Sequence, residues 1–409
     1  MLYQNTALDL IKNVEVQAIL GPTTSMQANF VIDLGEKARV PIMSFSATSP
    51  FLSSIRSTYY FRATLNDSTQ VNAISALVQA FGWRQAVPIY IDNEYGEGII
   101  PYLTDALQAV DARVSYRSVI SPSATDEQIV EELYKLMGMQ TRVFIVHMYG
   151  SLGTRLFAKA KEIGMMSEGC VRIMTDGLTA DLLSSPNPSV TGTMQGVLGV
   201  KPYVPSTKEL QDFRVRWKRK FQQDNPYIID AELNIYGLRG YDAATALALA
   251  VEKAGTTNFA SERQILLQAL SNTSFKGLTG DYHFVDGQLQ SPAFRIVNVN
   301  GNGGREIGFW TPKEKNVKQF VPSNGTNPNS VSSISSTVIF PGDTTAVPKG
   351  WGIPTKEKKL RIGVPVKSSL RQFVDVIRYP SSNTTIVTGF CIDVFDTVVK
   401  TFPYDLPYV

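Results

Sequence analysis

The sequence predicts an α/β fold with mostly parallel sheets, and three observations support this prediction. Short apolar runs recur along the chain and are separated by longer amphipathic stretches, which is the pattern of strands alternating with helices. Glycine and proline turns bound many of these runs. Hydrophobic residues make up 43% of the 409 positions, which is enough to build a large core. Because parallel strands are joined by right-handed crossovers, helices are expected on both faces of each sheet.

The first elements have clear boundaries. Val16–Leu20 is an apolar strand that stops at the turn Gly21-Pro22, and Ser25 can cap the helix that follows. The later expectations, in chain order, are a strand at 40–45, a helix capped by Asp67 or Ser68 and ended by Gly82, strands at 86–91, 112–119, 142–146 and 171–175, and helices at 96–110, 125–138 and 151–164. This regular alternation indicates βαβ units.

Longer helices follow, and then the chain becomes richer in strands. Two helices are expected at 206–222 and 232–254. Short segments with glycine turns come next, and Gly301–Gly304 lies between two apolar runs, where it predicts a hairpin. We therefore expect this part of the chain to complete the sheets that the first part begins.

The last part of the chain predicts a linker and a second unit. Pro322–Ser336 is rich in serine, asparagine, proline and glycine, cannot bury much surface, and predicts an exposed linker. A second α/β pattern then begins with a strand at 360–366 and a helix starting at 389–395. The chain ends at Val409, before that pattern can fill a domain, so a truncated second domain is expected.

The composition argues against catalysis and against nucleic acid as a partner. The net charge of +3 is too small, for this length, to attract nucleic acid. Cys170 and Cys391 form no Cys-x-x-Cys pair, and the only histidines are His147 and His283, so metal-ligand spacings are absent. The chain contains no nucleophile elbow, phosphate loop or complete dinucleotide fingerprint. We expect no enzyme activity, no cofactor and no metal site.

Hydroxyl-rich turns are the clearest candidates for binding. Gly21–Ser25 and Ser44–Pro50 both follow predicted strands and precede predicted helices, so their hydroxyl and N–H groups can receive a carboxylate. Acidic residues gather at Asp92–Gly98 and Asp176–Asp181, also after strands, where ligands of open α/β sheets bind. Simple helix capping explains all four segments equally well, and both interpretations stay open.

The order of several segments is similar to that of a known family. They are Ala18–Ser25, Arg39–Thr48, Tyr60–Arg62, Phe81–Trp83, Asp92–Gly96, Thr175–Gly177, Phe275–Gly280 and Ile307–Trp310. Together they resemble the type-I periplasmic-binding-protein-like amino-terminal domain of glutamate receptors. Four further segments extend the resemblance to the plant glutamate receptor-like channels, namely Pro341–Asp343, Pro348–Trp351, Leu360–Pro365 and Gly389–Phe395.

The resemblance implies a division of the chain into domains. Residues 1–310 would form a two-lobed clamp joined by three crossovers, with lobe one at 1–65 and 202–290 and lobe two at 66–201 and 291–310. Residues 311–358 would be a linker, and residues 359–409 the start of an amino-acid-binding domain. The first strand and helix of the clamp and a signal peptide would precede residue 1, and the pore would follow Val409.

The resemblance also implies ligand-binding residues. In relatives that bind amino acids in this domain, hydroxyl loops meet the α-carboxylate and α-amino groups, and the matching positions are Thr24, Ser25, Ser46, Ala47 and Thr48. Tyr95 matches a tyrosine that closes over the ligand, and Asp176 matches an acid that pairs with the α-amino group. Asp181 stands where those relatives have a basic residue, so it would repel a carboxylate side chain. A neutral or cationic amino acid fits no worse than glutamate.

The implied function is the extracellular, ligand-sensing portion of a glutamate-receptor-like, ligand-gated cation channel at the cell surface. Its partners would be a small amino-acid-like ligand and the other subunits of a homo- or hetero-tetramer, with membrane contact only through segments outside this sequence. Two alternatives stay open: a subunit-assembly module with a vestigial cleft, and a truncated gene product without function. Sequons at Asn66, Asn272, Asn324 and Asn383 permit glycosylation if the chain is secreted.

Overall fold

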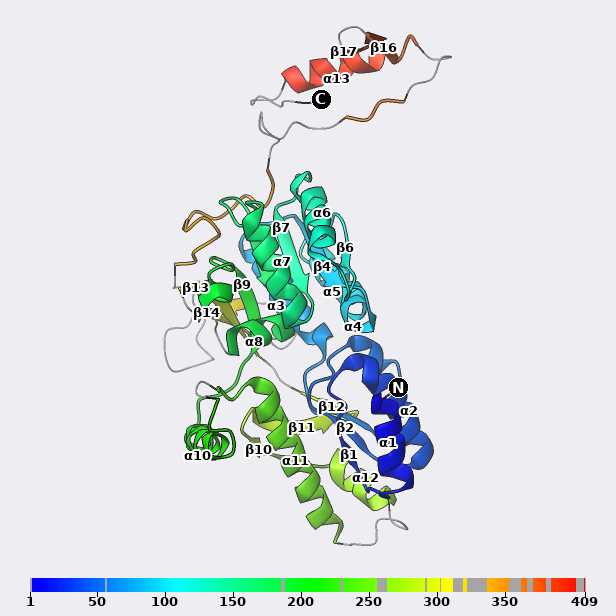
Figure 1. Ribbon diagram of the computed structural model, residues 1–409, viewed down its shortest axis with the longest axis vertical. Helices are drawn as coiled ribbons and strands as arrows, with labels where there is room; N and C mark the ends of the chain where they lie inside the picture. Colours follow the sequence, from blue (N-terminus) through cyan, green and yellow to red (C-terminus); the bar gives the residue numbers. More distant parts are fainter. Residues whose placement is uncertain are drawn as a thin grey trace. The chain divides into compact units, whose positions relative to one another are not determined.

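The computed structural model divides the chain into two compact units (Figure 1). The first comprises Met1–Leu133 and Thr141–Gly350, and the second Tyr134–Gln140 and Trp351–Val409. The structure describes residues 2–55, 57–184, 188–228, 231–255, 263–290, 293–301, 303–311, 319–321, 337–352, 362–365, 371–379, 384–401 and 408. Among these residues, no helix is both long and apolar enough to span a membrane.

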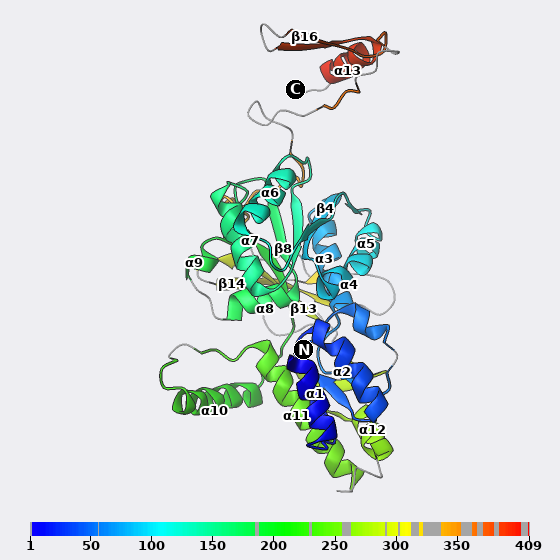
Figure 2. The ribbon, with the colours of Figure 1, turned by 45° about the vertical axis from the view of Figure 1, so that its right-hand side comes forward.

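One lobe of the first unit is built on a sheet of six described strands. In sheet order they are β1 (Ile19–Leu20), β2 (Ile42–Ser44), β3 (Tyr60–Arg62), β12 (Gln288–Leu289), β11 (Gly280–Val285) and β10 (Ser274–Gly277). The first four strands are parallel, and β11 and β10 add antiparallel pairs at the far edge. The helices of this lobe are α1 (Leu2–Lys12), α2 (Ser25–Ala38), α10 (Lys208–Asp224), α11 (Ile235–Ala254) and α12 (Arg263–Ser271), with the short 3-10 helix η1 at Pro50–Ser53. Helix α10 projects from the side of the lobe (Figure 2).

The other lobe is built on a sheet of nine described strands. The path runs β15 (Gln319–Val321), β14 (Gly303–Thr311), β13 (Phe294–Asn300), β9 (Leu198–Pro202), β8 (Val171–Met174), β7 (Val143–His147), β4 (Gln85–Ile91) and β5 (Arg113–Val114), with β6 (Ser118–Ile120) also on β4. Its helices are α3 (Asp67–Ala80), α4 (Glu94–Gly98), α5 (Ile100–Gln108), α6 (Asp126–Met137), α7 (Gly150–Glu162), α8 (Asp176–Ser184) and α9 (Pro188–Thr191). Figure 2 shows α3 and α5 on one face of the strands and α7 and α8 on the other.

The chain passes between the lobes three times. These crossovers lie between β3 and α3, between β9 and α10, and between β12 and β13. The parallel strands β4, β7, β8 and β9 form the centre of the second lobe, as expected for βαβ units. The predicted two-lobed α/β clamp is therefore confirmed.

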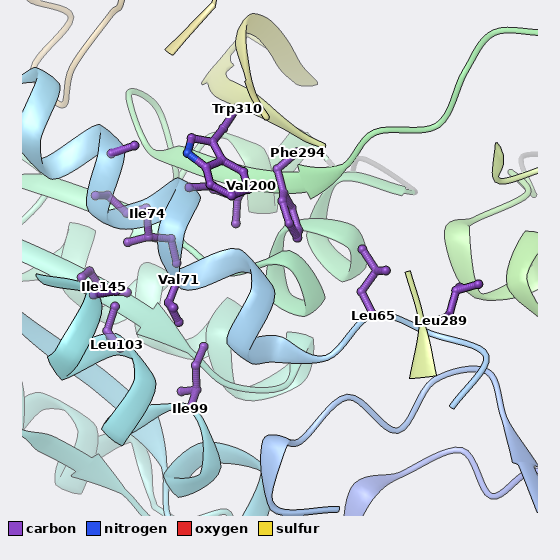
Figure 3. Close-up of a cluster of buried hydrophobic side chains, with 14 of the residues drawn as sticks. Leu65, Val71, Ile74, Ile99, Leu103, Ile145, Val200, Leu289, Phe294 and Trp310 are labelled. Carbon is purple, nitrogen blue, oxygen red and sulfur yellow. The ribbon is translucent and has the colours of Figure 1, made fainter. Parts of the chain in front are cut away.

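The core of the second lobe lies between α3, α5 and the sheet (Figure 3). Ile74, Ile145 and Val200 are fully shielded from solvent, and Phe294 and Trp310 close the end of the cluster. Continuous apolar runs such as β4 and β7 are typical of parallel strands that are covered on both faces. This packing fixes the carboxyl ends of these strands, where the candidate site begins.

Helix starts differ from the sequence prediction by one residue. Thr24, and not Ser25, is the N-cap of α2, because Thr24 has the extended backbone that a cap requires and its Oγ1 accepts from the Gln27 N–H at 3.4 Å. Asn66 caps α3 by accepting from the Ser68 N–H at 3.0 Å, which places Asp67 inside the helix and buries it. Neighbouring polar residues compete for the cap position, and only the backbone conformation decides between them.

Other elements also differ from the prediction. The predicted helix at 96–110 is two helices, α4 and α5, and α5 begins with proline in its first turn. The predicted strand at 112–119 is interrupted between β5 and β6, and Tyr116 in the interruption is exposed. Helix α1 at Leu2–Lys12 was not expected from the sequence, although Ala7, Leu10 and Ile11 pack one face of it against its lobe.

Residues 337–350, which the sequence assigns to the linker, pack on the second lobe. Val338 and Phe340 are buried in the core of that lobe. The indole N–H of Trp83 donates to the Pro348 carbonyl at 2.7 Å, and Gly350 lies so close that an added Cβ would be 2.6 Å from the Trp83 ring. Pro322–Ser336 lies outside the described residues. We call residues 337–350 the strap.

In its described residues after Trp351, the second unit contains a hairpin followed by a helix. Strands β16 (Asp375–Tyr379) and β17 (Thr384–Thr388) are antiparallel, and α13 (Phe390–Lys400) follows directly. The predicted helix at 389–395 is thus confirmed. Of the strand predicted at 360–366, residues 360, 361 and 366 lie outside the described part, and residues 362–365 form no strand. Asn324 and Asn383 also lie outside the described residues.

Candidate ligand-binding cleft

Two hydroxyl-rich loops of the first lobe, Gly21–Ser25 and Ser44–Pro50, lie against each other; we call them the hydroxyl loops. Ser44 Oγ donates to the Pro22 carbonyl at 2.7 Å and accepts from the Ala47 N–H at 3.0 Å. Ser46 Oγ donates to the Thr23 carbonyl at 2.8 Å. The parallel pairing of β1 with β2 brings the two loops together, because both follow the carboxyl ends of neighbouring strands. The hydroxyl groups therefore hold the loops in register.

Ser49, which the sequence reasoning did not single out, connects this region to the second lobe. Ser25 Oγ accepts from the Ser49 N–H at 3.2 Å, and Ser49 Oγ donates to the Glu94 carbonyl of α4 at 2.9 Å. Ser25, Ser49 and the intervening Thr48 are buried. The first-lobe loops thus contact the second lobe just before Tyr95.

The buried side chain of Arg62 holds the second hydroxyl-rich loop, Ser44–Pro50, in place. The Arg62 side chain is 0% exposed, and its Nη2 donates to the Ser49 carbonyl at 2.9 Å and its Nη1 to the Thr48 carbonyl at 3.4 Å. The sequence already shows a charged residue at the end of the otherwise apolar strand Tyr60–Arg62, and this pattern could have identified Arg62. Its planar guanidinium reaches two carbonyls at once, which a single ammonium could not do in the same way.

Tyr95 is held between two rings of the second lobe. It stacks on Tyr149 with a centroid distance of 5.0 Å and lies 4.2 Å from the His147 ring. His147 Nε2 donates to the Tyr95 carbonyl at 3.2 Å, and burial lowers the pKa of His147 to about 4, so this ring is neutral at ordinary pH. Burial also raises the pKa of Tyr95 well above its usual value, and the nearby Asp67 acts in the same direction.

Two buried acids lie close to Tyr95 and are joined by a glutamine. Gln70 Nε2 donates to Asp67 Oδ1 at 2.7 Å, and the Asp176 N–H donates to Gln70 Oε1 at 2.6 Å. Burial raises the pKa of Asp176 to about 6, although the Arg239 charge opposes the shift. Burial also raises the pKa of Asp67 to about 6, against the Thr48 hydroxyl and the Arg62 charge. The cluster therefore titrates under mildly acidic conditions.

Arg239 of α11 faces Asp176 across the interface between the lobes. Its Nη2 lies 3.7 Å from Asp176 Oδ2, and both side chains are almost completely buried. In the part of the chain that the structure describes, Asp176 Oδ1 and the Arg239 Nη1 and Nη2 atoms have no hydrogen-bond partner. Buried polar atoms normally find partners, so these atoms mark a place where a further polar group would be stabilised.

A cavity of about 570 Å³ lies next to this cluster. Tyr149, Ser151 and Asp181 of the second lobe line it together with Glu232 and Asn234 from the segment before α11. Asp181 Oδ2 accepts from the Gly150 N–H at 3.1 Å, and burial raises the pKa of Asp181. With two acids in its lining, the cavity favours neutral or cationic molecules over anions.

The structure gathers the seven candidate residues into two groups. Thr24, Ser25, Ser46, Ala47 and Thr48 belong to the bonded loops of the first lobe. Tyr95 and Asp176 belong to the buried group that also contains Asp67 and Gln70. Thr48 contacts this group through a side-chain hydrogen bond with Asp67. Asp67, Gln70 and Arg239 were not predicted, because no local pattern shows that these polar side chains are buried.

The raised pKa of Asp176 gives a pH dependence that can be measured. Because the folded-state pKa of about 6 exceeds the ordinary 3.8, the neutral acid stabilises the fold below pH 4, and this stability is lost as pH rises through 6. The difference corresponds to about 3 kcal/mol in the free energy of unfolding. Asp176→Asn removes this titration, so the stability of the variant relative to the wild type should rise between pH 4 and 7 in urea unfolding.

Asp111→Asn is the matched control, since the Asp111 side chain is 93% exposed. The pH profile of this variant should run parallel to that of the wild type. If Asp176→Asn also ran parallel, Asp176 would not be a buried titrating group.

Comparisons with known proteins place the chain in a receptor family and show that its fold is similar to that of solute-binding proteins. Residues 2–302 match the family described as receptor family ligand binding region. The chain is 51% identical over 424 residues to Glutamate receptor 2.1 of Arabidopsis thaliana, covering 98% of this chain and 46% of that protein. It is 50% identical to Glutamate receptor 2.2 of the same plant, with 98% and 45% coverage. The chain thus spans about half the length of these curated relatives.

Solved structures with a similar fold are solute-binding proteins. The leucine binding protein LivK from Thermotoga maritima superposes with a TM-score of 0.63 at 17% identity, covering 76% of this chain and 84% of that one. A solute binding protein from R. palustris in complex with benzoate gives a TM-score of 0.64 at 16% identity, with 75% and 81% coverage. At these identities the likeness shows the fold alone.

Proposed function

This chain belongs to the family of receptor ligand-binding regions, and on that basis we propose that it is the extracellular ligand-sensing part of a glutamate-receptor-like, ligand-gated cation channel. The similarity to the two Arabidopsis glutamate receptors over 98% of the chain supports this proposal. The ion-conducting segments would belong to the full-length protein, and this part would lie outside the cell. The division into a clamp at 1–310, a linker and the start of a second binding domain is part of the same proposal.

The single observation that supports ligand binding is a set of buried polar atoms between the lobes that lack hydrogen-bond partners among the described residues. Asp176 Oδ1 and two nitrogens of Arg239 are buried without partners among the described residues. We propose that the ammonium group of a small amino-acid-like ligand pairs with Asp176, under the ring of Tyr95. A ligand that bridges the lobes in this way would shift the equilibrium toward the closed clamp, because it contacts both lobes only when they are closed.

The hydroxyl loops are proposed to receive the ligand carboxylate. The positions are Thr24, Ser25 and Ser46–Thr48, next to the start of α2, where a helix N-terminus favours an anion. Ser46 Oγ already donates to the Thr23 carbonyl, so its hydroxyl must leave that carbonyl to bind a carboxylate. Ligand binding would then exchange one hydrogen bond for a charge-assisted one.

Asp181 is proposed to select the ligand side chain. It lies in the lining of the cleft cavity together with Glu232, and Glu232 is paired with Lys218 at 3.4 Å. Asp181 therefore carries the acidic charge that a ligand side chain meets first. A carboxylate side chain is repelled there, and a neutral or cationic side chain is not.

A thermal-shift screen of the 409-residue chain tests the proposal. Neutral and basic amino acids should raise the melting temperature, since a ligand at a hundred times its Kd stabilises the bound state by about 2.7 kcal/mol. Glutamate should have little effect on the wild type. In Asp181→Asn, removal of one like charge should raise the affinity for glutamate by roughly five- to tenfold.

Asp105→Asn, an exposed acid on α5, is the matched control and should leave the screen unchanged. A screen without any response would contradict the cleft proposal. A screen without response, combined with stable dimers in solution, would instead support a subunit-assembly module, in which the contact of Ser49 with Glu94 would help to hold the lobes together. Of the two described sequons, Asn272 is exposed and Asn66 is half-buried, so we propose Asn272 as the glycosylated residue.

A further inference from the structure

A second cavity, of about 450 Å³, lies beside the three crossovers. Each crossover contributes to its wall: Leu65 after β3, Pro202–Pro205 at the end of β9 and just after it, and Leu289–Gln290 at the end of β12. Figure 3 shows Leu65 and Leu289 at one end of the drawn cluster. We call this space the hinge cavity. Its size falls within the range of about 300 to 1,000 Å³ that is usual for small-molecule sites.

The wall of the hinge cavity is mainly apolar with one buried cation. Leu65, Ile235 and Leu289 supply apolar surface, and Arg239 forms part of the wall. Lys276 at the rim is the register partner of Asp281 across β10 and β11, so these two exposed charges offset each other. Arg239 is therefore the charge in the wall that a ligand inside the cavity meets, and this charge attracts a negative group.

Arg239 has hydrogen-bonding capacity to offer. The residue is 2% exposed, and in the described residues its Nη1 and Nη2 atoms have no hydrogen-bond partner. Its nearest acid, Asp176, is 3.7 Å away, which is an ion pair without a hydrogen bond. A carboxylate in the hinge cavity would give this guanidinium the bonds that Asp176 leaves unmade.

We propose that the hinge cavity binds a small organic monoanion with an apolar body, such as an arylalkyl carboxylate, and that Arg239 holds its carboxylate. The apolar body packs against Leu65, Ile235 and Leu289, and this burial supplies most of the affinity. The hinge cavity has a different lining from the cleft cavity, but both proposals draw on the buried Arg239 beside Asp176. Binding of an anion in the hinge cavity does not require a ligand in the cleft.

Occupation of the hinge cavity affects the contact between the lobes. Arg239 lies on a helix of the first lobe and Asp176 at the start of a helix of the second. An anion in the cavity competes with Asp176 for the same guanidinium, so it weakens the charge contact that joins the lobes. Since the cavity is lined by all three crossovers, its ligand also contacts the segments that must bend when the lobes move.

The test is titration calorimetry of the full 409-residue chain with phenylacetate. Phenylacetamide, which has nearly the same shape but no charge, is the matched control ligand. Phenylacetate should bind at least tenfold more tightly than phenylacetamide, because only the anion satisfies the buried guanidinium. Equal binding of the two would overturn the proposal, as would a lack of binding by phenylacetate and by longer arylalkyl carboxylates.

Three variants locate the site. Arg239→Met keeps the alkyl stem and should weaken phenylacetate binding at least tenfold. Gln290→Trp changes an exposed rim residue, leaves the buried arginine in place, and should block entry to the same extent. Asp176→Asn removes the competing acid and should tighten binding several-fold, which a purely structural role of Arg239 would not produce.

Asp181→Asn separates this site from the cleft, because Asp181 lines the cleft cavity. Phenylacetate binding should be unchanged in this variant. If Asp181→Asn altered it more than Gln290→Trp did, the ligand would be in the cleft and the hinge proposal would be overturned.

Discussion

Replacement of Trp83 by alanine should lower the free energy of unfolding by about 3 to 5 kcal/mol, the range for loss of a large buried aromatic side chain. The Trp83 side chain is 1% exposed, stacks on Phe81 at 4.8 Å and meets Phe340 edge-on at 6.3 Å. Its N–H also donates to the Pro348 carbonyl at 2.7 Å. The substitution therefore leaves a cavity under the strap and removes the bond that holds it. Urea unfolding measures the stability, and limited proteolysis should show new cleavage within 337–350.

Two further variants separate the contributions in Trp83. Trp83→Phe keeps a ring and loses the hydrogen bond, so it should cost less than alanine and still expose the strap to protease. Trp217→Ala is the matched control, because Trp217 is only half-buried and stacks on Phe221 within its own helix. A loss in Trp217→Ala as large as in Trp83→Ala would contradict this account.

Arg62→Met should lower the free energy of unfolding by a comparable amount, about 3 to 5 kcal/mol. The substitution removes a buried positive charge and leaves the polar groups that it contacts unsatisfied. The Thr48 and Ser49 carbonyls each lose a donor, and Asp67 loses the positive charge that opposes its raised pKa. The loop that carries the proposed carboxylate site then loses its support. Chemical denaturation should show the lost stability, and the thermal-shift response to amino acids should disappear with it.

Arg84→Met is the matched control for Arg62. The Arg84 side chain is 71% exposed and lies 3.9 Å from Asp111, which is 93% exposed, so its loss should change stability by less than about 0.5 kcal/mol. Arg62→Lys should rescue only part of the loss, because an ammonium cannot bond both carbonyls in a planar fork. Full rescue by lysine would mean that charge alone, and not the paired geometry, supports the loop.

The alternation of strands and helices could be predicted from the sequence because the strands are covered on both faces. The run at 86–91 became β4 at Gln85–Ile91, and the run at 142–146 became β7 at Val143–His147. Such strands are continuous apolar stretches, and nothing else of that length competes with them. The helix starts were less certain, since Thr24 and Ser25 are both good caps and only backbone conformation separates them.

The site was only partly predictable, for a different reason. Tyr95 and Asp176 were identified because they match family positions, whereas Arg239 lies inside a helix whose local pattern gives no hint of burial. Whether a polar side chain is buried depends on which distant segments pack over it, and that is a property of the whole fold. For the same reason Ser49 was not singled out within Ser44–Pro50 and Gln70 was not identified, although each bonds to a group far away in the chain.

The strap changes how much slack the chain has after the second lobe. If the whole proposed linker, residues 311–358, were loose, its 48 residues could stretch to about 160 Å at roughly 3.4 Å each. Because the strap is fastened as far as Gly350 and the Gly352 N–H donates to the Gln140 carbonyl at 2.8 Å, only the six residues 353–358 follow the last described contact, and these reach about 20 Å when fully extended. Because so few residues lie between the second lobe and residue 359, a small movement of that lobe would fully extend this segment, and any further movement would displace residue 359.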